Sequence, residues 1–350
     1  MWFFFNLAED LIQHTDRLRR LLPYYDFRDM LSEMLGELNA SHTGARYYGG
    51  GAAMQTASLG IFTDDSYEGE GIRVEEVIPN SPLALKQKNV KRGTIITAID
   101  GQKIAARQDY NAMLDGKAGK RVRLTIRDPK TGKTSDIVTK PLSAKAENEL
   151  LYRRWVDRNR RLVDSLSNGQ LAYVHVKEMN SESFRTVYRE LLSDKNRNRK
   201  AAIVDERHNG GGWLHDDLCT LLAGKEYHQF VPHGKYVGSD PYNKWLKPSC
   251  VLVCENDYSN GHGFPWVYKT LGIGKVIGAP VPGTMTAVWW ETLIDDTMIF
   301  GIPQVGCRDM NGTYGENTQL EPDIKVYNSP EDLINGHDRQ LETAVREMMK

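Results

Sequence analysis

A serine, a histidine and a carboxylate, far apart in this 350-residue sequence, are the residue types that carry out acyl transfer. Ser259, in the segment ENDYSNGHGFPW, follows an apolar run and precedes a predicted helix. A serine there is raised above a sheet on a tight turn, and the helix N-terminus stabilises nearby negative charge. Gly261 and Gly263 permit a sharp turn, but the GxSxG pattern is not matched. On this motif alone, a serine that only caps the turn is favoured over a nucleophile.

Two other segments supply the types of group that a nucleophilic serine needs. His42, beside Ser41 at the end of a predicted helix, is of the type that serves as a base at neutral pH. Glu316, in GENTQLEPD, could orient that base directly or through a hydroxyl. Each also has a plain interpretation, as a surface histidine near a helix end and as a loop acid. Glu321 and Asp323 compete with Glu316 for the role.

A glycine-rich loop follows another apolar run, in the segment DERHNGGG at residues 205–212. Consecutive backbone N–H groups there could stabilise an oxyanion or cradle a phosphate, and a plain flexible loop is an equal alternative. Neither GxxxxGK[ST] nor GxGxxG is present, so nucleotide binding is not supported. The sequence has no HExxH and no Cys/His quartet at zinc spacing, so we expect no metal and no cofactor. The histidines that could have suggested a metal are His208, His215, His228, His233 and His262.

Composition excludes several classes of function. Lys and Arg number 45 and Asp and Glu number 46, a net charge of −1, which argues against nucleic-acid binding by phosphate neutralisation. No run of 18 apolar residues is present, so we expect no membrane span. The N-terminal MWFFFNLAED has neither the basic residues nor the cleavage-site pattern of a signal peptide. With only four cysteines and no CxxC pair, a reducing, cytoplasmic location is weakly favoured.

The elements that must position these residues can be read from apolar periodicity. Residues 8–38 have helical spacing with a break at Pro23, and glycines at 49–51 mark a joint. A charged helix covers residues 146–168, and its interleaved acids argue against a nucleic-acid stripe. Strands and helices then alternate, which predicts a largely parallel sheet with function at the carboxyl ends of its strands. The expected strands are 171–176, 201–205, 251–254 and 275–278, and the expected helices are 183–192, 214–222 and 264–271.

Residues 52–145 read as short strands separated by turns, and they resemble a PDZ domain. The resemblance rests on the order of Leu59-Gly60-Ile61-Phe62, a short helix after Ser81-Pro82, and the strand and turn at 93–101. In such a domain the first loop presents backbone N–H groups to a peptide carboxylate, and the groove accepts the peptide as an added strand. The alternative is a small β-barrel without a ligand.

Taken in order, the motifs resemble the catalytic region of the tricorn protease family, within the carboxyl-terminal processing serine peptidases. The resemblance covers about residues 26–346. It implies an α+β or α/β multidomain fold: a helical cap at 1–48, a PDZ-like β-barrel at 52–145 and a crotonase-like α/β catalytic core at 146–350. It rests on EMLGELNASHTG, the PDZ-like unit, YRRWVDRNRRLV, VDERHNGGG, ENDYSNGHGFPW with KTLGIGKVIG, and YGENTQLEPDIKV.

The resemblance implies a catalytic tetrad. Ser259 would be the nucleophile and His42 the general base. Ser41 would hydrogen-bond the imidazole, and Glu316 would hold Ser41, which is triad logic with an intervening hydroxyl. The reaction would pass through an acyl-enzyme, with activity rising as His42 loses its proton near a pKa of about 6.5.

The resemblance also implies groups that contact substrate. The backbone N–H groups of Gly212 and Asn260 would form the oxyanion hole, and Asn260, Gly211 and Phe230 would bind substrate. The family has an aspartate where Asn260 stands, thought to anchor the substrate's amino terminus, so strict anchoring is not expected here. The family's acidic specificity residue has no counterpart in the segment 227–230, YHQF. We therefore expect a weaker preference for Lys or Arg and a shift toward apolar residues.

These observations predict a serine endopeptidase that acts on peptides or unfolded segments. The alternative is a catalytically degenerate, PDZ-containing peptide-binding protein, motivated by Asn260 and His262 after the serine. An acyl-CoA enzyme of the crotonase-like fold, which would use no serine, is the least favoured. By resemblance we expect a homo-oligomer. The family also carries β-propeller domains ahead of this region, and whether this chain is part of a longer propeller-containing protein stays open.

Overall fold

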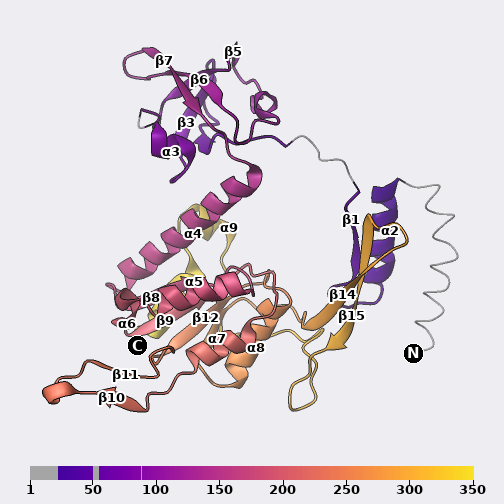
Figure 1. Ribbon diagram of the computed structural model, residues 1–350, viewed down its shortest axis with the longest axis vertical. Coiled ribbons are helices and arrows are strands. Elements are labelled where there is room, and N and C mark those ends of the chain that lie inside the picture. Colours follow the sequence, from indigo (N-terminus) through magenta and orange to yellow (C-terminus); the bar gives the residue numbers. More distant parts are fainter. Residues whose placement is uncertain (1–22, 50–54, 88) are drawn as a thin grey trace. The chain divides into compact units, whose positions relative to one another are not determined.

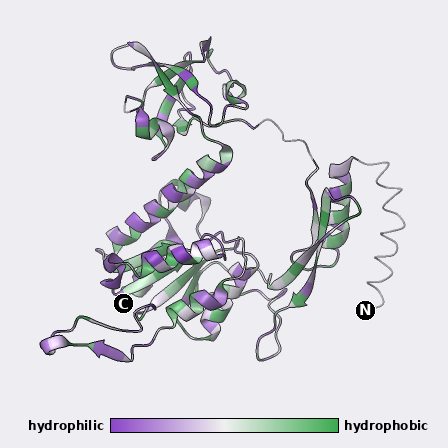
Figure 2. Ribbon diagram, in the orientation of Figure 1, coloured by the Kyte–Doolittle hydropathy of each residue, from purple (hydrophilic) through white to green (hydrophobic). Residues whose placement is uncertain are grey.

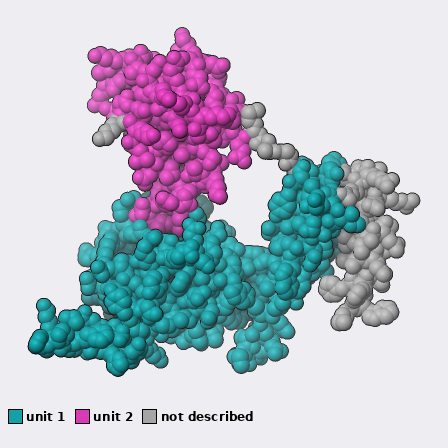
Figure 3. Space-filling model, viewed as in Figure 1, with its two compact units in different colours: residues 1–49, 159–350 teal, residues 50–158 magenta. Residues whose placement is uncertain are grey.

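The computed structural model describes residues 23–49, 55–87 and 89–350, and it divides into two compact units (Figure 3). One unit joins residues 1–49 to residues 159–350, and the other is residues 50–158. Residues 8–22 of the predicted helical stretch, the segment compared with a signal peptide, and two of the three joint glycines lie outside the described residues.

The larger unit contains a five-stranded parallel sheet in the order β16-β13-β12-β9-β8. Figure 1 labels three of these strands, β8, β9 and β12. Three of the sheet's strands are buried along their whole length, which is typical of a parallel sheet covered on both faces. They are the ones whose sequences are almost continuous apolar runs, as Figure 2 shows. The strands are β8 (Leu171–His175), β9 (Ala201–Asp205), β12 (Ser249–Val253), β13 (Lys275–Gly278) and β16 (Ile324–Lys325).

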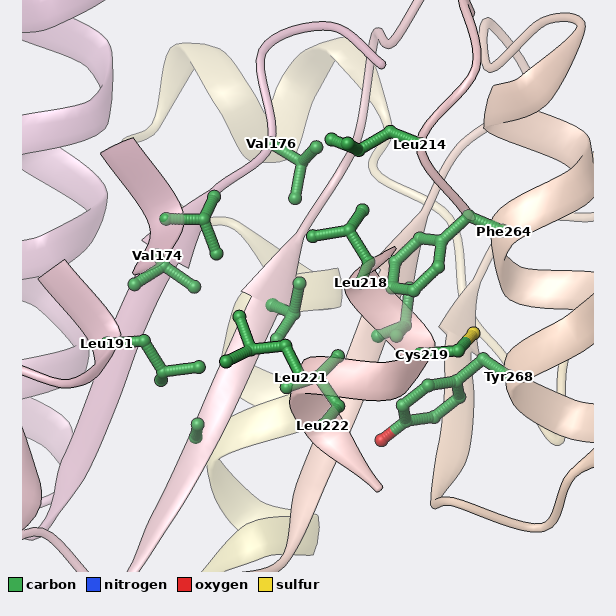
Figure 4. Close-up of a cluster of buried hydrophobic side chains, with 14 of the residues drawn as sticks. Val174, Val176, Leu191, Leu214, Leu218, Cys219, Leu221, Leu222, Phe264 and Tyr268 are labelled. Carbon is green, nitrogen blue, oxygen red and sulfur yellow. The ribbon is translucent and has the colours of Figure 1, made fainter. Parts of the chain in front are cut away.

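Helices in the connections between the strands cover the sheet. Three of them share one buried cluster with the strands, in which Leu191, Leu218 and Phe264 each represent a different helix (Figure 4). The C-terminal helix packs on the same strands through Leu341 and Val345, which are also buried. The helices of this part are α5 (Ser181–Leu191), α6 (Asp194–Arg197), α7 (His215–Leu222), α8 (Asn260–Thr270), α9 (Pro330–Ile334) and α10 (Arg339–Met348).

The predicted β-α alternation is confirmed, with one informative difference. Helix α8 begins at Asn260, four residues before its expected start, because the turn at Ser259 leads directly into it. The early glycines therefore lie in the first turn of the helix rather than in a loop.

A smaller layer in the same unit holds the turn that contains Ser41 and His42. Helix α2 packs its apolar face, including Phe27 and Leu31, on a three-stranded antiparallel sheet ordered β1-β15-β14. Two of these strands form a hairpin that the sequence analysis did not predict. The elements are α2 (Tyr24–Gly36), β1 (Gly44–Tyr47), β14 (Thr286–Thr292) and β15 (Met298–Gly306). A protruding hairpin also follows α7, formed by β10 (His228–Phe230) and β11 (Gly238–Asp240), with the 3₁₀ turn η2 (Pro232–Gly234) at its tip.

The second unit contains an open antiparallel sheet ordered β2-β3-β4-β6-β7, with β5 beside β4. Among the described residues no pairing joins β2 to β7, so the predicted closed barrel is an open sheet. Its own core gathers around Val74, Leu83 and Leu124. Its elements are β2 (Ile61–Thr63), β3 (Ile72–Val77), α3 (Pro82–Lys86), β4 (Ile95–Ile99), β5 (Gln102–Lys103), η1 (Asn111–Leu114), β6 (Val122–Arg127) and β7 (Thr134–Thr139).

The predicted charged helix is α4 (Ala144–Leu166), whose residues are mostly hydrophilic (Figure 2). Its arginines form ion pairs with acids of their own unit: Arg154 with Glu76, and Arg160 with Glu190. The sequence analysis expected acids of the helix itself to interleave with its arginines, and Arg153 with Glu149 is a pair of that kind. No described helix is both long and apolar enough to cross a membrane.

Candidate active site

Ser259 lies at the end of the connection between β12 and α8, with backbone angles that few residues adopt. Its φ is +57° and its ψ is −119°, a strained conformation for a residue with a side chain. Its backbone N–H donates a hydrogen bond to Thr284 Oγ1 at 2.8 Å. The turn needs a glycine beside it, because a Cβ on Gly211 would lie 2.6 Å from Ser259 Cβ. Strain of this kind is characteristic of functional sites, where the surrounding structure holds it in place.

Gly212 and Asn260, which line the same cavity as Ser259, each have a backbone N–H group to consider. Gly212 forms a parallel bridge with Met179, which uses the carbonyl of Gly211 and the N–H of Trp213 and leaves the N–H of Gly212 free. Asn260 is the first residue of α8, where no helical acceptor exists for its N–H. Neither group has an acceptor within the described part of the chain. Unpaired backbone N–H groups are the type of donor that an oxyanion hole uses.

A Cβ on Gly212 would approach Met179 O to 2.2 Å, so glycine is required there as well. Both Gly211 and Gly212 have positive φ, +97° and +132°. The glycine loop is therefore shaped by close backbone contacts, and an ordinary flexible loop does not describe it.

Ser41, His42 and Glu316 form a hydrogen-bonded chain. Glu316 holds Ser41 with both carboxylate oxygens, one accepting from the backbone N–H and the other from the hydroxyl at 2.8 Å. Ser41 Oγ lies 2.8 Å from His42 Nδ1. The ring of His42 packs against the ring of Tyr258. The hydroxyl of Tyr258 accepts a hydrogen bond from the backbone N–H of His42 at 2.7 Å. The structure thus brings together residues separated by 275 positions in the sequence.

Thr286 is a contact that the sequence analysis missed. Its Oγ1 lies 2.8 Å from Ser41 Oγ and 3.0 Å from His42 Nδ1. A threonine between a turn and a strand has no recognisable motif, and only the antiparallel hairpin of β14 and β15 brings it to the histidine.

Burial sets the charge state of the histidine. The pKa of His42 is lowered from 6.5, chiefly because half-burial disfavours the charged ring. The carboxylate of Glu316 acts in the opposite direction, and the charge of Arg46 adds to the lowering. His42 is therefore neutral, and able to accept a proton, over a wider range of pH than a free histidine.

Ser259 and His42 line one cavity of about 350 Å³. Among the described residues, no hydrogen bond joins the side chains of Ser259 and His42. In proteins without bound substrate, the distance between a nucleophile and its base is often too long for a hydrogen bond. At the cavity, Trp213 leaves 64% of its surface exposed. The lining residues are His42, Gly210, Gly212, Trp213, Ser259, Asn260, Met285, Thr286, Ala287 and Val288.

Of the three expected substrate contacts, Asn260 lines the cavity but its side chain is engaged elsewhere, and neither Gly211 nor Phe230 is among the lining residues. The side chain of Asn260 is buried, and its oxygen accepts the backbone N–H groups of Leu214 and His215 at 2.8 and 3.1 Å. It therefore caps the start of α7. Phe230 lies on the protruding hairpin, half-exposed, and is not among the lining residues.

His262 is buried, and burial lowers its pKa to about 4, so it is a neutral ring packed on Trp266.

Buried polar groups fasten the loops of the serine and the glycines together. Asp257 accepts the backbone N–H groups of Cys254 at 2.7 Å and Asn209 at 3.2 Å. Asn209 in turn accepts from the backbone N–H of Tyr258 at 2.9 Å. Burial raises the pKa of Asp257 well above its usual range, and the same holds for the neighbouring carboxyl of Glu206. Among the described residues, no group of three or more His, Cys, Asp or Glu could hold a metal.

Comparison with known proteins gives two family matches and several relatives. Residues 67–144 match the model of the tricorn protease PDZ domain, and residues 170–326 match that of peptidase family S41. The chain is 28% identical over 355 residues to a putative tricorn-like protease C-terminal subunit of Sulfurisphaera tokodaii, covering 97% of this chain and 40% of that protein. It is 30% identical over 338 residues to tricorn protease homolog 1 of Streptomyces coelicolor, covering 94% and 31%.

The crystal structure of the tricorn protease superposes with a TM-score of 0.82 at 24% identity, over 98% of this chain and 34% of that one. At this identity the match shows a shared fold. The chain spans less than half the length of these relatives.

Proposed function

This chain belongs to the tricorn-type serine peptidases of family S41, and we propose that it is an endopeptidase that cleaves peptides or unfolded polypeptide segments through a Ser-His-Ser-Glu tetrad and an acyl-enzyme. One observation carries the proposal. The hydrogen-bonded chain from Glu316 through Ser41 to His42 ends at the cavity that Ser259 also lines.

The first step is acylation. The hydroxyl of Ser259 attacks the carbonyl carbon of the scissile peptide bond, and its proton passes to Nε2 of His42. Because Nδ1 of His42 faces Ser41, its other nitrogen is the one available to the cavity. The protonated His42 then gives its proton to the leaving amine, and the acyl group remains as an ester on Ser259.

Deacylation repeats these steps with water. His42 accepts a proton from the water that attacks the ester, and the acid product leaves as Ser259 regains its proton. In both halves the negative charge on the tetrahedral oxygen is stabilised by the N–H groups of Gly212 and Asn260. Removing one such donor typically costs about 10²- to 10³-fold in rate.

The surroundings of the cavity favour apolar side chains of the substrate. Trp213, Met285 and Val288 supply apolar surface, and no acidic residue is among the lining residues. The side chain of Asn260 caps α7 and carries no charge, so we do not assign it the role of anchoring a substrate amino terminus. We propose binding without strict anchoring, by backbone contacts at the glycine loop and by these apolar groups.

A serine-reactive fluorophosphonate tests the proposal directly. We expect intact-mass analysis to show one label and peptide mapping to place it on Ser259. Labelling should be lost in Ser259→Ala and strongly slowed in His42→Ala. Ser135→Ala, which removes an exposed serine of β7, is the matched control and should label normally. A folded protein with neither labelling nor turnover of unstructured peptides would instead favour the PDZ-containing peptide-binding protein.

Three finer expectations belong to the same proposal. We propose that the parallel sheet and its helices are a crotonase-like core, that the chain associates with copies of itself, and that it acts in the cytoplasm. The parallel order β16-β13-β12-β9-β8 supports the first. The second is supported by the exposed apolar and aromatic side chains of the protruding hairpin, which are Tyr227, Phe230, Val231, Tyr236, Val237 and Tyr242.

A further inference from the structure

Thr286 places a hydroxyl at the junction between Ser41 and His42 that the tetrad mechanism does not use. Its Oγ1 lies within hydrogen-bonding distance of both Ser41 Oγ, at 2.8 Å, and His42 Nδ1, at 3.0 Å. Ser41 Oγ therefore has three polar neighbours, the third being Glu316 Oε2 at 2.8 Å.

Counting protons assigns a direction to each of these bonds. An ionised carboxylate only accepts, so the hydroxyl proton of Ser41 must go to Glu316. The oxygen of Ser41 then has only lone pairs left, and it accepts from both His42 and Thr286. Nδ1 of His42 consequently carries a proton. The N–H group donates to Ser41 Oγ, and Thr286 Oγ1 is a second acceptor for the same proton.

The backbone holds this hydroxyl in place. Thr286 is the first residue of β14 and pairs in register with Gly306 of β15. Two residues earlier, Thr284 bridges Glu316 and accepts the backbone N–H of Ser259. A threonine has few side-chain rotamers because it is branched at Cβ, so fixing its backbone largely fixes its hydroxyl.

We propose that Thr286 is a positioning residue for the catalytic histidine. Its hydroxyl donates to Ser41 and accepts from Nδ1–H of His42, which holds the imidazole in the tautomer whose Nε2 lone pair faces the cavity. After proton transfer the same contacts stabilise the imidazolium ion. The inference rests on the proposed function, since it assigns a role toward the base of that reaction.

The test compares three variants of the full chain. Thr286→Val keeps the shape and removes the hydroxyl, Thr286→Ser keeps the hydroxyl, and Thr292→Val makes the same exchange at the exposed end of the same strand. We expect Thr286→Val to lower kcat by roughly ten- to a hundredfold, the size of a lost hydrogen bond to a charged group, with little change in KM. Thr286→Ser should stay within a few-fold of the natural chain, and Thr292→Val should be unaffected.

The pH profile separates positioning from general packing. Losing an acceptor for Nδ1–H disfavours the charged ring, so the acid limb of kcat/KM should move to lower pH in Thr286→Val and stay in place in Thr286→Ser. A merely structural role would lower activity or stability without moving this limb. If the valine variant does not fold, Thr286→Ala carries the same expectation.

Nitrogen-15 spectra of the histidines in the natural chain give a second reading that needs no folded valine variant. We expect a pyrrole-type Nδ1 for His42 at neutral pH, assigned with His42→Gln. A pyridine-type Nδ1 would overturn the inference, as would an active Thr286→Val with an unchanged acid limb. If the natural chain neither labels on Ser259 nor cleaves peptides, it is the proposed function that fails.

Discussion

At the scale of single residues, the site is organised around one neutral histidine whose two nitrogens have different tasks. Nδ1 of His42 lies within hydrogen-bonding distance of the hydroxyls of Ser41 and Thr286, and Glu316 accepts a hydrogen bond from the Ser41 hydroxyl. A negative charge one hydroxyl away raises the histidine pKa less than burial lowers it. His42 is therefore unprotonated at neutral pH, as the proposed mechanism requires of its base.

The pH dependence of activity follows from that balance. Because the pKa of His42 is lowered from 6.5, kcat/KM should rise with pH through an acid limb below this value and level off at neutral pH. The measurement is a pH profile with an uncharged peptide substrate. Arg46→Gln removes a charge that lowers the pKa, so its limb should lie at higher pH. A rate that is flat from acid to alkaline pH would exclude a histidine base.

At the scale of elements, an arginine fastens the C-terminal helix to the end of β9. Arg207 is buried and donates to Asp205 at 2.7 and 2.9 Å and to Asp338 at 2.9 Å. Asp338 also caps α10 by accepting from the backbone N–H of Leu341. Arg207 also begins the turn that leads to the glycine loop at 210–212. Its side chain therefore connects the start of α10 to the chain segment that enters this loop.

Removing this arginine should be costly, because it leaves two buried carboxylates without their partner. We expect Arg207→Ala to lower the free energy of unfolding by about 3–5 kcal/mol. Arg153→Ala, which removes an exposed pair with Glu149, should cost about 0.5 kcal/mol or less. Urea unfolding followed by circular dichroism measures both. Equal losses in the two variants would contradict a special role for the buried arginine.

The elements also show what could be predicted from the sequence. Apolar runs such as those of β9 and β12 identify buried parallel strands, and the helices between them follow from periodicity. The hairpin of β14 and β15 was missed because its residues alternate weakly and its partner strand, β1, lies far away in the sequence. Its contact, Thr286, was missed with it.

The parts of the candidate site that could be predicted from the sequence are those that lie in recognisable motifs. Ser41, His42, Ser259 and Glu316 stand in motifs, and the structure places Ser41, His42 and Glu316 in one hydrogen-bonded chain. The side-chain role of Asn260 was not predictable, because it depends on where the N-terminus of α7 falls in space.

At the scale of the whole molecule, association with other copies is the expectation that the chain's surface best supports. The hairpin of β10 and β11 exposes apolar and aromatic side chains along most of its length, which is unusual for a surface that meets only water. We expect light scattering after size-exclusion chromatography to give a mass that is a multiple of the chain mass. A single-chain mass over a range of concentrations would contradict this.

The bond between Ser41 and Glu316 has a consequence for the order in which the molecule becomes active. Its two ends are separated by 275 positions, and Ser259, the proposed nucleophile, lies between them in the sequence. During synthesis, Ser41, His42 and Ser259 all emerge before Glu316 does. On the proposed mechanism, a growing chain therefore carries its base and nucleophile without the carboxylate that aligns them. On that mechanism, efficient cleavage by a chain must wait until the segment that contains Glu316 has been made and has folded against Ser41.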